Sequence, residues 1–244
     1  MSMELYRKIV DEIVTIPQVD RLVLHGLGEP TLDRFLEARI KYARIARPDI
    51  TIEIYSHGAH LSPNRFEGLK EAGLTSLVFS LNAVRPEQHE AIMGLKGKFD
   101  DVCSNIEYAI SHKENVGIEI HAVSNDDTFT EDDRIVFYQR WGVSGEEGGY
   151  GTCVREMNWA GLNRTTIEIK GNECCSRAVG QIYVMYDGRV TMCCLDVTGK
   201  TVFGDLNNQT IREVYNSEYY TMFRALHSSD KAAVFKAWKG CTRT

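Results

Sequence analysis

Residues 21–25 (Arg-Leu-Val-Leu-His) and the stretch that follows them, Gly26-Leu27-Gly28-Glu29-Pro30, decide the fold of this chain. The first segment is a short apolar run, which is typical of a buried strand in a parallel sheet. The second places two glycines, a carboxylate and a proline directly after it. Parallel α/β folds bind ligands at the carboxyl ends of their strands, because loops and helix N-termini present N–H groups there. The two segments therefore predict a strand that ends in a ligand-binding loop.

The segments around this strand alternate between two hydrophobic periods. Apolar strand-like runs occur at 51–55, 76–81, 118–123 and 154–159, and amphipathic helical patterns separate them. Such alternation predicts βα units and a parallel sheet or barrel. The chain opens on a helical pattern that Ser2 is placed to cap, with no strand-like run before it. We expect further helices at 31–46, 63–72, 131–141 and around 102–112.

The pattern of strand-like and helical segments changes after about residue 162, where we place a domain boundary between 1–162 and 163–244. Two short β-like runs, 182–186 and 189–192, flank Asp187-Gly188, a pair that suits the tight primed turn of a β-hairpin. Thr210 is placed to cap a following helix, and Met222, Phe223 and Leu226 continue an apolar stripe beyond it. The C-terminal part is therefore expected to be a small hairpin-and-helix domain.

Composition excludes several classes of protein. The 244 residues are 43% hydrophobic and 25% charged, as in ordinary globular proteins, and the net charge of −6 argues against nucleic acid or anionic membrane as a partner. No run approaches the roughly 18 apolar residues of a membrane span, and the N-terminus lacks the apolar core of a signal peptide, so we expect a cytoplasmic protein. Seven cysteines in such a protein favour metal or redox chemistry over disulfides.

Three consecutive strands of the predicted sheet end in small polar residues. Glu29, Ser56, and the pair Ser80 and Asn82 supply a carboxylate, hydroxyl groups and an amide that suit a ligand's ammonium, ribose or carboxylate. Ordinary βα turns have the same composition, so each group alone is equally explained as turn chemistry. We expect the nearby histidines to be packing residues; these are His25, His57, His60 and His121. We expect the acidic runs at 126–127, 131–133 and 146–147 to be solvated charge.

The motifs resemble those of the radical SAM enzymes. Gly26 to Pro30 is similar to the family's Gly-Gly-Glu-Pro motif, residues 55–58 resemble its Thr-Asn-Gly turn with departures at Ser56 and His57, and residues 79–82 and 158–161 are similar to later strand ends. The resemblance covers residues 1 to about 161 and implies a partial (βα)₆ barrel that lacks its first strand. It also implies that S-adenosylmethionine (SAM) binds to the following residues: Gly26, Gly28, Glu29, Pro30, Ser56, Ser80 and Asn82.

The cysteines of the last third resemble a SPASM or twitch domain. Cys175, Gly188 and Cys193 have the spacing with which that domain opens, and Cys241 is similar to its late cysteine. The resemblance implies that these three cysteines ligate an auxiliary [4Fe–4S] cluster. The family's other late cysteine is replaced by Trp238, so the fourth ligand is Cys174, Cys194 or a non-cysteine group. Buried cysteines without metal, or a structural zinc site, are the alternatives.

The family's Cys-x-x-x-Cys-x-x-Cys loop does not occur in this sequence. Cys103 and Cys153 are isolated and are expected to be core residues rather than ligands. In the family that loop follows the first strand, just before a helix like the one that opens this chain. We therefore expect a truncated reading frame, with a strand and the cysteine loop encoded upstream of Met1.

The resemblance implies a radical SAM oxidoreductase or a peptide- or protein-modifying enzyme, with SAM and an auxiliary cluster as cofactors. The alternatives are a catalytically silent iron–sulfur protein that retains the fold, and an α/β enzyme with structural zinc. No catalytic residue is assigned, and neither the substrate nor the oligomeric state can be read from the sequence.

Overall fold

The structure is a computed structural model that describes residues 1–124, 128–155 and 176–227. The chain forms two compact units, and the first helix belongs with the C-terminal third rather than with the sheet that follows it in sequence. One unit comprises Pro17–Glu156, and the other comprises Met1–Ile16 together with Met157–Thr244. The predicted boundary near residue 162 lies outside the described residues and stays a prediction.

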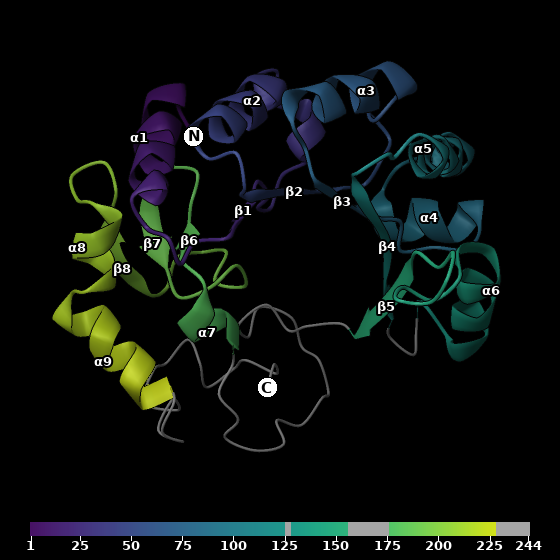
Figure 1. Cartoon of the computed structure of the whole chain (residues 1–244). Coiled ribbons are helices and arrows are strands. Elements are labelled where there is room, and N and C mark those ends of the chain that lie inside the picture. The colour runs from purple at the N-terminus through teal and green to yellow at the C-terminus, as the bar shows by residue number, and fades with distance from the viewer. Residues whose placement is uncertain (125–127, 156–175, 228–244) are drawn as a thin grey trace. The chain divides into compact units, whose positions relative to one another are not determined.

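The larger unit contains a five-stranded parallel sheet whose strands are ordered as they occur along the chain (Figure 1). The strands are β1 (Arg21–Val23), β2 (Thr51–Ser56), β3 (Ser76–Ser80), β4 (Gly117–Ser124) and β5 (Gly151–Arg155). Each is parallel to the next. A sequential parallel sheet with helical crossovers is the arrangement of a partial βα barrel, so the predicted fold class is confirmed.

Helices cover one face of this sheet and leave its other face to the concave side (Figure 1). The sheet residues that point toward the helices form the core, and Ile52, Ile54, Leu77 and Phe79 are completely buried. This burial is what the apolar runs of the sequence require. The helices of the unit are η1 (Pro30–Leu32), α2 (Leu36–Ala46), α3 (Pro63–Ala72), α4 (Pro86–Met93), α5 (Phe99–Ser111) and α6 (Glu131–Trp141).

Local signals explain why α3 and α6 begin and end where the sequence predicted. The hydroxyl of Ser62 accepts the backbone N–H of Arg65, and Gly73 ends α3 in the left-handed region with φ 105°. Thr130 and Asp133 form a capping box at the start of α6. Side chains that accept the first N–H groups fix the start of a helix, and a glycine in the left-handed region fixes its end.

Two predicted elements differ from the structure, and one helix was not predicted. The helix expected at 31–46 is interrupted after η1, because the Asp33 carboxylate accepts the backbone N–H of Phe35 at 2.9 Å and holds the chain extended there. Helix α4 was not predicted, although Pro86 stands at its first turn. Strand β5 begins at Gly151, earlier than expected, and the predicted residues 156–159 lie outside the described part.

The smaller unit contains a three-stranded antiparallel sheet in the order β6–β7–β8. The predicted hairpin is confirmed, but its turn is not the primed turn expected from Asp187-Gly188. Gly188 has φ 99°, whereas Asp187 is absent from the described residues with positive φ and instead accepts the backbone N–H of Arg189. The elements are α1 (Met3–Val14), α7 (Ser176–Gly180), β6 (Tyr183–Val184), β7 (Arg189–Thr191), β8 (Val202–Asp205), α8 (Ile211–Tyr215) and α9 (Glu218–His227).

Charged side chains of α1 dock this helix against the segment that leads into α8. Lys8 donates to the carbonyl oxygens of Leu206 and Gln209, and the Glu12 carboxylate accepts the backbone N–H of Ile211 at 2.5 Å. Ser2 caps α1 and Thr210 caps α8, as the sequence predicted. The expected stripe on α9 is only partly buried, because Met222 is 46% exposed whereas Phe223 is fully buried. None of the described helices is long and apolar enough to cross a membrane.

Candidate functional site

The Glu29 carboxylate joins the loop after β1 to the end of β2. Its Oε1 accepts the Ser56 hydroxyl at 2.7 Å and both the hydroxyl and the backbone N–H of Thr31, at 2.5 and 3.0 Å. Its Oε2 accepts the backbone N–H of His57 at 2.9 Å. The carboxylate therefore points toward Ser56, as the convergence of parallel strand ends requires.

This environment keeps Glu29 ionised. Burial alone raises the pKa of the Glu29 carboxyl, but the hydrogen bonds from Thr31, His57 and Ser56 outweigh it and leave the pKa below its usual value. Oε1 has three donors, whereas Oε2 has the His57 N–H and, at 3.4 Å, the His57 imidazole Nε2. A side chain that is 9% exposed and carries a full negative charge fits a ligand ammonium at Oε2.

The remaining residues predicted for SAM have different surroundings. Gly28 is exposed, and a Cβ added to it would meet nothing within 4 Å, so the loop backbone is open there. Gly26 is also exposed, and Pro30 opens η1. Asn82 has φ 56°, and its side-chain oxygen accepts the backbone N–H of Val123 on β4 at 2.9 Å. Its amide nitrogen contacts the Met93 sulfur, so Asn82 also has a structural role between strands.

The histidines near the strand ends contact neighbouring rings: His25 and His121 lie against Tyr55, and His57 lies against His60. His25 and His60 are exposed, and His57 contacts Glu29. His121 pairs with the Glu119 carboxylate at 2.9 Å on the sheet face opposite the helices. This pair was missed from the sequence, although the alternation Ile-Glu-Ile-His at 118–121 signals a strand with one polar face.

Asp133 is not the solvated charge that we expected of its acidic run, whereas Glu131, Asp132, Glu146 and Glu147 are exposed, as expected. Asp133 is buried and accepts hydrogen bonds from Thr130, Gln88 and Arg85, which joins the starts of α4 and α6. Burial raises the pKa of Asp133, but the hydrogen bonds from Thr130 and Arg85 and the charge of Arg85 outweigh this effect and leave the pKa below its usual value. Residues 126–127 lie outside the described part.

Two cysteines of the predicted cluster region lie directly after β7. Cys193 is 6% exposed, and Cys194 beside it accepts an N–H of Arg177 at 3.3 Å. Arg177 lies on α7, which begins immediately after Cys175. This contact brings the start of α7 to the end of β7, as thiolates that converge on one cluster would require. Cys174, Cys175 and Cys241 lie outside the described residues, so the ligand set stays a prediction.

The isolated cysteines are protected thiols. Cys103 is 3% exposed, as expected for a core residue, and burial raises the pKa of its thiol to about 11. Cys153 is half-buried, and burial again raises its pKa. Within 1–124, 128–155 and 176–227, no three His, Cys, Asp or Glu side chains are grouped to hold a metal ion.

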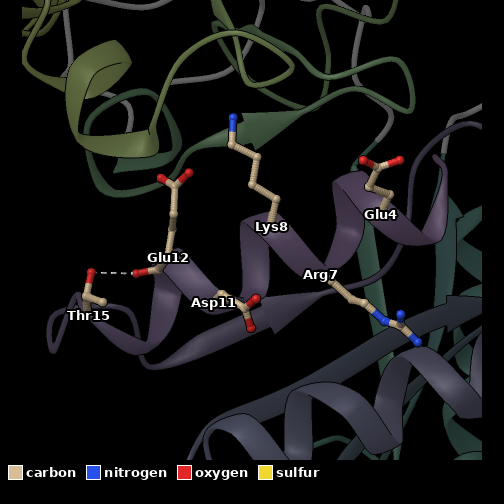
Figure 2. A pocket seen from close by; sticks show the side chains of 6 residues that line it. All are labelled: Glu4, Arg7, Lys8, Asp11, Glu12 and Thr15. Carbon is tan, nitrogen blue, oxygen red and sulfur yellow. Dashed lines mark hydrogen bonds between the residues drawn. The ribbon is translucent and has the colours of Figure 1, made fainter.

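A surface hollow along α1 is separate from these residues (Figure 2). Figure 2 shows Lys8 and Glu12 projecting to the same side of the helix, and the Thr15 hydroxyl donating to the Glu12 carbonyl oxygen. Because Lys8 and Glu12 bind backbone groups of 206–211, the hollow reflects the docking of α1 rather than a ligand site. Its lining residues are Glu4, Arg7, Lys8, Asp11, Glu12 and Thr15.

Two family models match the chain. The model of the radical SAM superfamily matches residues 1–134, and that of the SPASM iron–sulfur cluster-binding domain matches residues 174–242. Together these families indicate SAM and an iron–sulfur cluster as cofactors.

Two curated proteins are similar to this chain in sequence, and their names describe different activities. The S-adenosyl-L-methionine-dependent 2-deoxy-scyllo-inosamine dehydrogenase of Niallia circulans is 23% identical over 230 residues, which are 93% of this chain and 74% of that protein. The tungsten-containing aldehyde ferredoxin oxidoreductase cofactor-modifying protein of Pyrococcus furiosus is 24% identical over 127 residues, 49% of this chain and 35% of that protein. The first relative therefore matches both parts of this chain, and the second about half of it.

Solved structures share the fold. BtrN in complex with AdoMet and 2-DOIA is similar with a TM-score of 0.68 and 17% identity, covering 100% of this chain and 81% of BtrN. The enzyme anSMEcpe with AdoMet and the Cp18Cys peptide has a TM-score of 0.71 and 17% identity, covering 99% of this chain and 81% of that chain. With a family model matched over more than half of its length and this shared fold, the chain belongs to the radical SAM superfamily.

Proposed function

We propose that this protein is a SAM-dependent oxidoreductase that also binds an auxiliary [4Fe–4S] cluster. The observation that carries the proposal is the Glu29 carboxylate, which Ser56, Thr31 and the His57 backbone hold ionised at the strand ends. Glu29 would bind the methionyl ammonium of SAM through Oε2. The exposed backbone at Gly26 and Gly28 would let the ligand approach closely, and Pro30 at the start of η1, Ser80 at the end of β3 and Asn82 beyond it would complete the site.

The auxiliary cluster would be held by Cys175, Cys193 and Cys241. Support comes from the buried Cys193 thiol and from the Arg177–Cys194 contact that joins the two cysteine-bearing segments. When bound, SAM and iron–sulfur clusters supply radical and one-electron chemistry, and the chain's own residues bind and orient them. A cytoplasmic location and the absence of nucleic acid and membrane partners stay predictions from composition.

The dehydrogenase among the relatives, matched over most of this chain, favours oxidation of a small molecule. Modification of a peptide or protein is the alternative within the same family, since a solved relative was crystallised with a peptide. A catalytically silent iron–sulfur protein is the second candidate function. It would apply if the whole protein had no Cys-x-x-x-Cys-x-x-Cys triplet, which residues 1–244 do not contain, to hold a cluster beside the SAM sulfonium.

The test combines binding with chemistry. The chain is reconstituted anaerobically with iron and sulfide, its visible absorbance is recorded, and SAM binding is measured by calorimetry. Formation of 5′-deoxyadenosine after addition of dithionite would support the oxidoreductase. The absence of SAM binding would overturn the proposed SAM site, and the absence of cluster absorbance would overturn the auxiliary cluster.

A further inference from the structure

Two strands of the sheet, β2 and β4 on either side of β3, each contain a segment that alternates strictly between apolar and polar residues. Strand β2 reads Ile-Glu-Ile-Tyr at 52–55, and β4 reads Ile-Glu-Ile-His at 118–121. The isoleucines are at most 7% exposed and lie on the face that the helices cover. The polar residues therefore occupy the opposite face, because successive side chains of a strand point to opposite sides.

This pattern is unusual for parallel strands. Parallel sheets are normally buried on both faces and carry continuous apolar runs, and the interior of a closed βα barrel is packed with branched apolar side chains. Here the register places Tyr55 beside Val78, and Val78 beside Glu119, so a carboxylate and a phenol lie in one layer. On this face of the sheet, β2 and β4 thus carry polar side chains at positions where packing alone would select Val, Ile or Leu.

Three of these residues, Tyr55, Glu119 and His121, form a cluster with His25, which lies just beyond β1, and we call these four residues the inner-face cluster. The His25 ring lies on Tyr55 with the ring centres 4.8 Å apart and the planes 30° apart. The edge of His121 approaches Tyr55 at 6.0 Å and 72°. The rings thus form a row that runs from the end of β1 to β4, over the small side chain of Val78 on β3.

The carboxylates on this face differ in what they can still bind. Glu53 is 7% exposed, and its Oε2 already accepts the Arg21 guanidinium at 2.5 Å and the Ser76 hydroxyl at 2.9 Å. Glu119 is 49% exposed, and its partner among the described residues is the His121 imidazole at 2.9 Å. Glu53 is therefore neutralised by a permanent cation, whereas Glu119 has an imidazole partner and an accessible carboxylate beside an aromatic row.

We propose that the inner-face cluster binds a small polyhydroxylated amine as the substrate. Glu119 would accept the ammonium, the Tyr55 ring would lie against the apolar C–H groups of the molecule, and the Tyr55 and His121 polar atoms would bind its hydroxyl groups. Peptide recognition by main-chain pairing at a sheet edge or by an apolar groove uses features other than this combination of rings and charge. The inference rests on the proposed function and names its substrate class.

The experiment measures binding to the whole chain by calorimetry, with 2-deoxy-scyllo-inosamine as the probe and scyllo-inositol as its uncharged counterpart. The amine is expected to bind the unmodified chain at least threefold more tightly than the inositol. Glu119→Gln should weaken amine binding about three- to tenfold and leave inositol binding unchanged, because a half-exposed charge pair is partly screened. Raising the salt concentration should weaken only the amine.

The matched control is Glu71→Gln, which removes an exposed carboxylate from α3 on the helical side of the sheet. Circular dichroism confirms that each variant is folded, and SAM binding is measured in the same samples. Failure of SAM binding with intact amine binding would count against the proposed function alone. The substrate proposal is overturned if the amine does not bind at about 10 mM, if Glu119→Gln binds it as well as the unmodified chain does, or if a cysteine-containing peptide competes for the Glu119-dependent site.

Discussion

The Ser56 hydroxyl donates to Oε1 of Glu29 across 2.7 Å and so ties the loop after β1 to the end of β2. The same hydroxyl oxygen accepts the backbone N–H of Gly58 at 3.0 Å. Ser56 is therefore fixed on both sides, and it fixes one oxygen of the Glu29 carboxylate in turn. The other carboxylate oxygen, Oε2, faces the His57 backbone and imidazole.

Replacing Glu29 by Gln should weaken SAM binding about ten- to a hundredfold, because a charged hydrogen bond in a buried site contributes roughly 1.5–3 kcal/mol. Ser56→Ala should have a smaller effect in the same direction, since Glu29 keeps its charge and its Thr31 and His57 donors. Calorimetric titration with SAM measures both constants. Glu71→Gln serves as the control, and equal affinity in Glu29→Gln and the unmodified chain would exclude Glu29 from the site.

The lowered pKa of Glu29 also makes the stability of the fold depend on pH. A carboxyl whose pKa is lower in the folded chain contributes stability above its unfolded value, near 4.5, and loses it as the pH falls through the lower folded pKa. The difference in unfolding free energy between the unmodified chain and Glu29→Gln should therefore be constant from about pH 5.5 to 7, because these pH values lie at least ~1 unit above the unfolded pKa. The difference should shrink below about pH 4.5. Urea unfolding at a series of pH values measures it, and a difference that grew on acidification would contradict the assignment.

Sequence reasoning was most successful where local chemistry decides the structure. Ser62 and Gly73 bracket α3, and Thr130 starts α6, because cap residues act within a few positions of themselves. It was less successful where a distant partner decides. Asp133 was expected to be solvated, yet Arg85 and Gln88 on α4 surround it, and nothing local to residue 133 indicates those partners.

The candidate site shows the same division. The meeting of Glu29 and Ser56 could be predicted, because the carboxyl ends of adjacent parallel strands lie together. The role of His57 depends on a backbone N–H, which every residue type except proline supplies, so its identity carried no signal. The pair Glu119 and His121 had a signal in the two-residue alternation of β4, but the sequence analysis predicts only a strand there.

Gly73→Ala should destabilise the chain by about 1–3 kcal/mol, since an alanine in the left-handed region is strained and its Cβ would lie 2.7 Å from Cγ of Arg44. Gly94→Ala is the matched control: Gly94 also ends a helix with positive φ, 67°, but a Cβ there meets nothing within 4 Å. It should cost only the conformational part, about 1 kcal/mol. Urea unfolding compares the two variants, and a larger loss in Gly94→Ala would show that the Arg44 contact has no energetic weight.

Replacing Cys193 by Ala should abolish iron binding after anaerobic reconstitution, whereas Cys103→Ala should leave it unchanged. Cys193 is buried directly after β7, where the contact between Arg177 and Cys194 also brings the segment that follows Cys175. Cys103 is buried in α5 with a thiol pKa of about 11, so it is protonated at neutral pH and is a poor metal ligand. Iron analysis and visible absorbance measure the outcome, with unfolding curves to show that each variant is folded. Unchanged iron in a folded Cys193→Ala variant would remove Cys193 from the ligand set, and zinc in place of iron would favour a structural zinc site.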